Sequence, residues 1–227
     1  MLQAIAPNIW HVQHEFAANG LRISSRMTVV RLANGALWLH SPIPIDAVLR
    51  SQLMALGKVD FIVAPNKMHH LFAAECQAAF PGSKLFGAPG LKAKRPDLKE
   101  LIELDCGAET AWQDELEQLF FGGIPLGNET VWFHKASGTL ILTDLCQWWQ
   151  GELPFAAKAY ATLTGVRRQL AVPRMVRWMV KDRQAARISA QGILRWPITR
   201  VISAHNVIVE QDAHAALEKA FSCFIDG

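Results

Sequence analysis

The 227-residue sequence predicts an α/β fold, and three observations carry that prediction. Short apolar runs alternate with segments whose apolar residues recur at helical spacing. Two hairpin signals are present, one around Asn34-Gly35 and one around residues 135–138. Residues 60–72 begin as an apolar strand, stop at Pro65-Asn66 and then resume with helical spacing. Such a strand, tight loop and helix is typical of α/β proteins, which place ligands at the carboxyl ends of buried strands.

The elements of the first half follow from alternation, periodicity and turn residues. Gly57 suits the end of a helix, and Pro81-Gly82 ends the next helical run. In chain order we expect a strand at residues 8–14, strands at 27–32 and 36–40, a helix at 45–56, a strand at 61–64, a helix from His69 onward, and a short strand at 84–86.

The second half starts with strands and continues with helices. Pro154, Pro173 and Pro197 punctuate the helical part. We expect a strand or bridge at 116–121, a hairpin of strands 129–134 and 139–143, one or two helices within 174–195, a strand at 199–204 and a closing helix at 211–224.

Composition and length indicate one globular domain that spans residues 1–227. The hydrophobic share is 51% and the charged share 19%, which is unlike a disordered chain. No run approaches the roughly 20 apolar residues that a membrane span needs. The amino terminus lacks the basic and long apolar regions of a signal peptide. The four cysteines show no paired spacing, so neither a zinc ribbon nor a disulfide framework is predicted. We therefore expect a cytoplasmic protein.

Positive charge is concentrated in one segment of the chain. Residues 151–200 contain ten Lys or Arg and two acidic residues, which gives a local net charge of +8. Four tryptophans lie in or beside this segment: Trp148, Trp149, Trp178 and Trp196. Arg and Trp together suit an anionic ligand or a membrane surface. The simpler interpretation is a solvated helical face whose tryptophans pack inward.

Three stretches resemble the metallo-β-lactamase fold. Residues 60–72, predicted as a strand, a histidine-containing loop and the start of a helix, are similar to the metal-binding motif of that fold, His-x-His-x-Asp-His. Residues 139–144 resemble the strand that ends in the metal-bridging aspartate, and residues 200–205 resemble the strand that ends in the last metal-binding histidine. The finer pattern is closest to the DUF4336 branch, and the likeness extends from about Pro7 to the end. It implies a four-layer αβ/βα sandwich in which the loops after these strands converge.

The same resemblance implies a reduced metal site. The first two histidine positions fall near Asn66 and Lys67-Met68, which are poor ligands for a hydrolytic metal. Glu129 is a candidate substitute for a third histidine position. The residues left are His69, His70, Asp144 and His205, with His69 in place of the missing aspartate. They could hold one ion, zinc or another divalent metal, or no ion if the site is vestigial.

Structural interpretations of these residues stay open. His69 and His70 could bond backbone groups in a first helical turn, and Asp144 could cap a following helix. His205-Asn206 could simply turn the chain.

The resemblance implies a metal-dependent hydrolase that acts on a small, anionic substrate through one metal ion. In this hypothesis a helical, cap-like segment at about residues 146–196 covers the cleft. Its predicted substrate-binding residues are Arg167, Arg168, Arg174 and Arg177. The alternative is a non-catalytic binding or scaffold protein that has lost the metal. A small-molecule substrate is the expected partner, nucleic acid and a transmembrane segment are not expected, and no oligomeric state is predicted.

Overall fold

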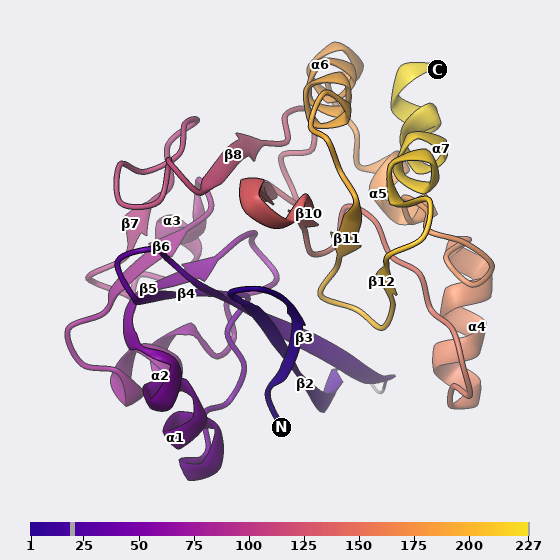
Figure 1. Ribbon diagram of the computed structural model, residues 1–227. Coiled ribbons are helices and arrows are strands. Elements are labelled where there is room, and N and C mark those ends of the chain that lie inside the picture. Colours follow the sequence, from indigo (N-terminus) through magenta and orange to yellow (C-terminus); the bar gives the residue numbers. More distant parts are fainter. Residues whose placement is uncertain (19–20, 227) are drawn as a thin grey trace. The chain divides into compact units, whose positions relative to one another are not determined.

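The computed structural model describes residues 1–18 and 21–226 (Figure 1). The contacts divide the chain into two compact units. The first unit comprises residues 1–14 and 25–105, and the second comprises residues 15–24 and 106–227. The described residues form twelve strands and seven α-helices, so the predicted α/β class is confirmed.

A seven-stranded sheet follows the chain in strand order from β1 to β7. It belongs to the first unit except for the end of β2 after His14 and the start of β3 before Ser25, which are assigned to the second unit. Strand β4 pairs antiparallel with β3 and parallel with β5, and the pairing stays parallel through β6 to β7. The strands are β1 (Gln3–Ala6), β2 (Ile9–Ala18), β3 (Leu21–Arg31), β4 (Ala36–His40), β5 (Lys58–Ala64), β6 (Lys84–Gly87) and β7 (Ile102–Glu103).

The predicted hairpin around Asn34-Gly35 joins β3 to β4. Gly35 has a φ of 84°, a conformation that favours glycine, and Asn34 Oδ1 accepts the N–H of Ala36 at 2.9 Å. Helices α1 (Ala47–Leu56) and α2 (Ala73–Ala79) pack on β5, and α3 (Leu91–Lys94) packs on β7. The N–H of Leu49 donates to Asp46, which caps α1.

One helix boundary was predicted wrongly. The helix expected from His69 onward begins at Ala73. Asn66 Oδ1 accepts the N–H groups of both Met68 and His69, each at 2.8 Å. This side chain therefore holds the residues after β5 in turns and delays the helix.

The second unit contains a five-stranded sheet in the order β12-β11-β10-β9-β8. Strands β10 and β11 are parallel, and the other neighbours are antiparallel. The strands are β8 (Leu116–Phe120), β9 (Thr130–His134), β10 (Thr139–Ile141), β11 (Arg200–Ile202) and β12 (Ile208–Val209). The predicted hairpin of β9 and β10 turns through a short 3-10 helix (Lys135–Ser137) and Gly138.

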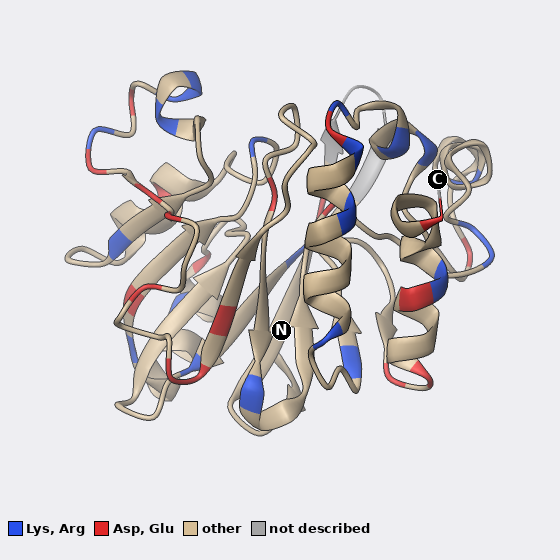
Figure 2. Ribbon diagram, turned by 90° about the horizontal axis from the view of Figure 1, so that it is seen from above, with Lys and Arg blue, Asp and Glu red and all other residues tan. Residues whose placement is uncertain are grey.

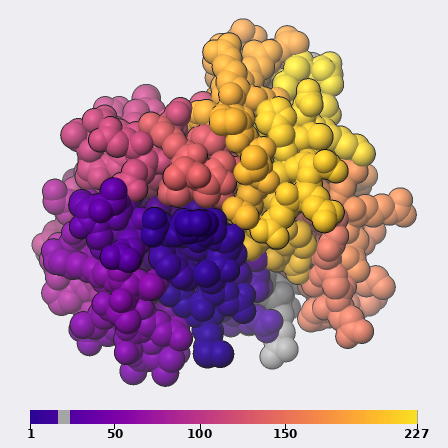
Figure 3. Space-filling view, in the orientation of Figure 1, coloured from indigo at the N-terminus to yellow at the C-terminus, as the bar shows by residue number. Residues whose placement is uncertain are grey.

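Four helices complete the second unit: α4 (Phe155–Thr164), α5 (Arg174–Trp178), α6 (Arg183–Leu194) and α7 (Ala213–Ile225). Helices α6 and α7 pack against each other, as their orange and yellow atoms show in Figure 3. Between α5 and α6 the N–H groups of Lys181 and Asp182 donate to the carbonyl oxygen of Gly123. That break resolves the predicted "one or two helices" into two.

The positive charges of the helices are spread along them. Lys and Arg occur at intervals between uncharged residues on the helices, rather than in one continuous block (Figure 2). No helix in the described part of the chain combines the length and apolar character needed to cross a bilayer. The single domain and the cap-like role of residues 146–196 stay predictions.

Candidate metal centre

In the first unit, the β5–α2 loop carries His69 and His70. Asn66 cannot act as a metal ligand in the described arrangement, because its side-chain oxygen already accepts two backbone N–H groups. Met68 is exposed. The loop therefore retains only its two histidines as metal-ligand candidates.

His69 is half-buried, and its ring is oriented by Ser41. Nδ1 of His69 lies 2.7 Å from the hydroxyl oxygen of Ser41, which is itself buried. A serine hydroxyl can accept as well as donate, so His69 can carry its proton on Nδ1 and leave a lone pair on Nε2. Metal-binding histidines commonly donate their second ring nitrogen in this way.

His70 is held differently. Nη1 of Arg95 lies 2.9 Å from Nδ1 of His70. A guanidinium group only donates, so Nδ1 accepts and the neutral ring carries its proton on Nε2. Burial lowers the pKa of His70, and the charges of Lys94 and Arg95 lower it further. In this state neither ring nitrogen offers a free lone pair to a metal ion.

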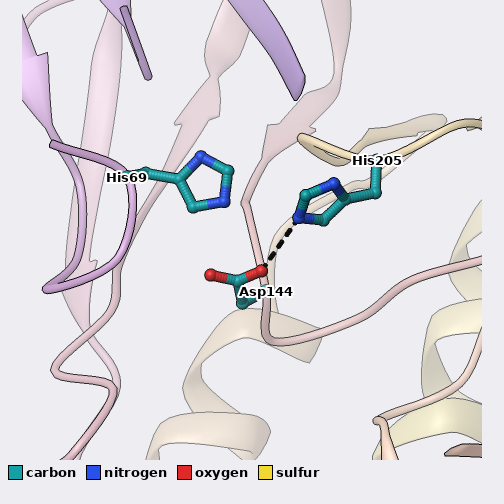
Figure 4. Close-up of side chains that lie close together, drawn as sticks. All are labelled: His69, Asp144 and His205. Carbon is teal, nitrogen blue, oxygen red and sulfur yellow. Dashed lines mark hydrogen bonds and ion pairs between the residues drawn. The ribbon is translucent and has the colours of Figure 1, made fainter. Parts of the chain in front are cut away.

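In the second unit, the ends of β10 and β11 bring Asp144 and His205 together. Figure 4 shows the two side chains pointing at each other, and also draws His69. Nε2 of His205 lies 3.0 Å from Oδ1 of Asp144, and Nδ1 of His205 lies 2.8 Å from the carbonyl oxygen of Ser24. A carbonyl only accepts, so Nδ1 is the donor. Nε2 then faces a carboxylate, and the contact is favourable only when a proton or a cation lies between them.

Neighbouring side chains fix this pair. Nε2 of Gln147 donates to Oδ1 of Asp144 at 3.2 Å, and the indole N–H of Trp149 donates to Oε1 of Gln147 at 2.9 Å. The Trp149 ring also stacks on His205 with centroids 5.8 Å apart. His205 is buried, whereas the side chain of Asp144 is 27% exposed. The carboxylate is therefore the solvent-accessible member of the pair.

Glu129 anchors the backbone beside Asp144. Its Oε1 accepts the N–H of Thr143 at 2.7 Å, and its Oε2 accepts the N–H groups of Asp144 and Leu145 at 2.9 and 3.0 Å. Burial raises the pKa of Glu129, the charge of Asp144 raises it further, and the backbone N–H groups act in the opposite direction. Both oxygens are engaged, so Glu129 is a positioning residue and not the substitute ligand that the sequence suggested.

Of the structural roles considered for Asp144 and His205, the structure supports only the second. Asp144 does not cap a following helix, because the next helix, α4, begins at Phe155. His205 does precede a turn, since Asn206 has a φ of 55°. The roles of Gln147 and Trp149 were missed, because nothing in their spacing shows that they meet Asp144 and His205.

The four predicted substrate-binding arginines lie in the second unit and differ in their contacts. Arg167 donates to the carbonyl oxygens of Trp149 and Gly151, and Arg174 donates to that of Leu163. Arg177 donates through Nε to the carbonyl oxygen of Val172 at 3.1 Å. Arg168 is exposed. Their role in substrate binding stays a prediction.

The donor set fits a divalent metal ion. Imidazole nitrogen and carboxylate oxygen are ligands that zinc, iron and manganese accept. The hydrogen bond from Nδ1 of His205 to a backbone carbonyl is the usual support for a metal-binding imidazole. The loop of the first unit lacks the donors for a second ion, because Asn66 is engaged and Lys67 is a cation.

Comparison with solved structures identifies the fold. The chain is similar to DIM-1 metallo-beta-lactamase, with 15% identity, a TM-score of 0.64, and coverage of 99% of this chain and 96% of that one. It is also similar to the metallo-beta-lactamase from Pontibacter korlensis (13%, 0.66, 99% and 98%) and to the one from Hirschia baltica (9%, 0.65, 99% and 97%). These likenesses confirm the predicted fold, the metallo-β-lactamase sandwich.

The family follows from the sequence itself. Residues 7–169 match the family described as "Domain of unknown function (DUF4336)". The chain belongs to this family, as the motifs indicated. No curated protein matches the chain.

Proposed function

We propose that the protein binds one divalent metal ion through Asp144, His205 and a histidine of the β5–α2 loop, and hydrolyses a small, anionic substrate. The observation that carries this proposal is the Asp144–His205 pair. A histidine whose Nδ1 donates to a carbonyl aims the lone pair of Nε2 at a carboxylate oxygen 3.0 Å away. Such a pair is chemically complete with a cation between or beside its two members.

His69 is the better third ligand in this proposal. His69, Asp144 and His205 are a set of ligand types that can hold a metal ion. The Ser41 hydroxyl allows His69 the tautomer that a ligand needs, whereas the Arg95 guanidinium gives His70 the opposite one. We therefore assign His70 to the support of the loop, and narrow the sequence prediction to three ligands.

The protein's own residues would prepare the site. Gln147 orients the Asp144 carboxylate, and Trp149 covers one face of the His205 ring and limits its exposure to water. Glu129 fixes the backbone from which Asp144 projects. Zinc or a similar ion would supply Lewis acidity and an activated water molecule. The cytoplasmic location and the small-molecule substrate belong to the same proposal.

The second candidate is a binding or scaffold protein without metal. The engaged Asn66 and the Arg95–His70 contact favour it, since both replace metal-binding chemistry with structural contacts. In that case His205 is doubly protonated, and its contact with Asp144 is an ion pair.

A hydrolysis screen separates the two candidates. Apoprotein should be loaded with zinc, iron(II) or manganese(II) and assayed against chromogenic lactam, thioester and phosphodiester substrates. The proposal predicts turnover that needs metal and is lost in Asp144→Asn and His205→Ala but kept in the matched controls Asp226→Asn and His214→Ala. Zinc binding without turnover of any substrate would contradict hydrolysis, and no metal binding would favour the scaffold.

A further inference from the structure

Residues of α5, α6 and α7 in the second unit, together with Val180 between α5 and α6, line a partly open cavity that the proposed metal chemistry does not use. Its volume is about 390 Å³. We call it the α5–α7 cavity, and its lining residues are Arg177, Trp178, Val180, Arg183, Ala186, Cys223 and Phe224. Ligand pockets in proteins span about 300–1,000 Å³, so a compact molecule with one ring would fit.

Two arginines make the cavity positive. Nε of Arg177 donates to the carbonyl oxygen of Val172 at 3.1 Å, and this hydrogen bond restrains the side chain. Across the part of the chain that the structure describes, neither Arg177 nor Arg183 forms an ion pair with a carboxylate. Their guanidinium groups can therefore offer N–H donors to an outside anion, and phosphate or carboxylate matches that planar geometry.

The rest of the lining is apolar. The side chain of Trp178 is 79% exposed, although a tryptophan ring gains much from burial. Val180 is half-buried, and Phe224, which also lines the cavity, is buried. An aromatic ring bound beside Trp178 would cover that exposed surface. The cavity thus joins an anion-binding part to an apolar part.

The thiol of Cys223 completes the lining without adding charge. Its Sγ donates to the carbonyl oxygen of Ala220 at 3.4 Å. Burial raises the pKa of this thiol, and the charge of Arg177 only partly offsets the effect. A neutral thiol does not repel an anion and is a poor nucleophile, so binding rather than covalent chemistry is favoured.

We infer that the α5–α7 cavity binds a small aromatic anion, with the phosphate or carboxylate held by Arg177 and Arg183 and the ring placed against Trp178 and Phe224. This site lies within one unit of the chain. It does not depend on the proposed metal ion or on hydrolysis.

The test uses phenyl phosphate and benzoate as probes. Two comparison compounds each carry only one of the two features: inorganic phosphate is an anion without a ring, and benzyl alcohol is an aromatic ring without a charge. Calorimetric titration of the full chain should show saturable binding of at least one probe, and weaker binding of inorganic phosphate and of benzyl alcohol. Arg183→Gln should weaken the affinity for the probe by about tenfold or more, because charge-assisted hydrogen bonds are lost. Arg187→Gln, one turn further along α6 and outside the cavity lining, is the matched control and should bind normally.

A second readout locates the probe. Bound probe should slow maleimide labelling of Cys223 but leave the exposed Cys106 unchanged. The same labelling of Cys223, with and without probe, is measured on Arg177→Gln, provided that thermal unfolding shows that this variant is folded. The proposal is overturned if neither probe binds, if Arg183→Gln binds as tightly as Arg187→Gln, or if Cys223 is not protected.

Discussion

Nε2 of His205 lies 3.0 Å from Oδ1 of Asp144, while Nδ1 of the same ring is engaged with the carbonyl oxygen of Ser24. The two ring nitrogens thus have different roles, and the one that faces the carboxylate is the one without a proton in the neutral ring. The pair needs a positive centre, either a second proton or a metal ion.

Glu129→Gln tests the anchor beneath Asp144. An amide keeps one acceptor but turns an NH₂ group toward backbone N–H groups that now lack a partner. Each unsatisfied buried donor costs about 1–3 kcal/mol, so we expect a loss of about 3 kcal/mol in the free energy of unfolding. Urea unfolding measures it. Glu152→Gln, at an exposed position, is the control; an equal, small loss in both variants would contradict the anchoring role.

The two loop histidines should behave differently. His69→Gln should remove bound metal, because it deletes the proposed third ligand. His70→Gln should leave metal stoichiometry near that of the wild type and reduce stability modestly, because Nη1 of Arg95 loses its contact with the imidazole ring. Metal analysis after dialysis distinguishes them, with circular dichroism to verify folding. Loss of metal in His70→Gln alone would reverse the assignment.

Acid should weaken the first unit through His11. This ring is buried and accepts from Nε of Arg26 at 3.3 Å, and burial together with the Arg26 charge lowers its pKa to about 4. In the unfolded chain its pKa is about 6.5. Between these values the unfolded state binds more protons, so the free energy of unfolding decreases as pH falls.

At pH 5 the His11 contribution amounts to a loss of about 2 kcal/mol relative to pH 7. Burial lowers the pKa of His40 to about 3, and His40 acts in the same direction. Urea unfolding at the two pH values should show the loss, and His11→Gln should reduce it. An unchanged pH dependence in His11→Gln would rule out His11 as the source.

Two glycines with the same backbone conformation test close packing in the second unit. Gly123 and Gly151 have φ values of 84° and 79°. A Cβ at Gly123 would overlap the carbonyl oxygen of Asp182, whereas none of the described atoms lies within 4 Å of one at Gly151. Gly151→Ala should cost about 1 kcal/mol for the backbone conformation, and Gly123→Ala about 3 kcal/mol or more. Comparable thermal shifts would contradict the packing of Gly123 against the start of α6.

The sequence predicted the elements whose signals are local. The Asn34-Gly35 turn, the apolar runs of β5 and β11, and the periodicity of α7 are all encoded within a few residues. Asp144 and His205 were selected as candidate ligands because residues 139–144 and 200–205 resemble two metal-binding motifs of the metallo-β-lactamase fold. The parallel pairing of β10 with β11 brings the ends of those two strands together.

The contacts that give those residues their roles depend on distant parts of the chain. The carbonyl of Ser24, which sets the tautomer of His205, is 181 residues away in sequence. The tautomer of His70 depends on Arg95, which is 25 residues away in sequence. The helix start was misplaced because periodicity outweighed the turn signal of Asn66. Side-chain partners across such separations leave no pattern in a single sequence.

The most direct test of the central claim is the metal content of the purified protein. Wild-type protein, loaded with zinc and desalted, should retain about one ion per chain, because three protein ligands hold zinc firmly. Asp144→Asn and His205→Ala should retain almost none, while His214→Ala retains the wild-type amount. A wild-type protein that holds no zinc, iron or manganese after loading, or variants that hold as much as the wild type, would contradict the claim that Asp144 and His205 form a metal centre.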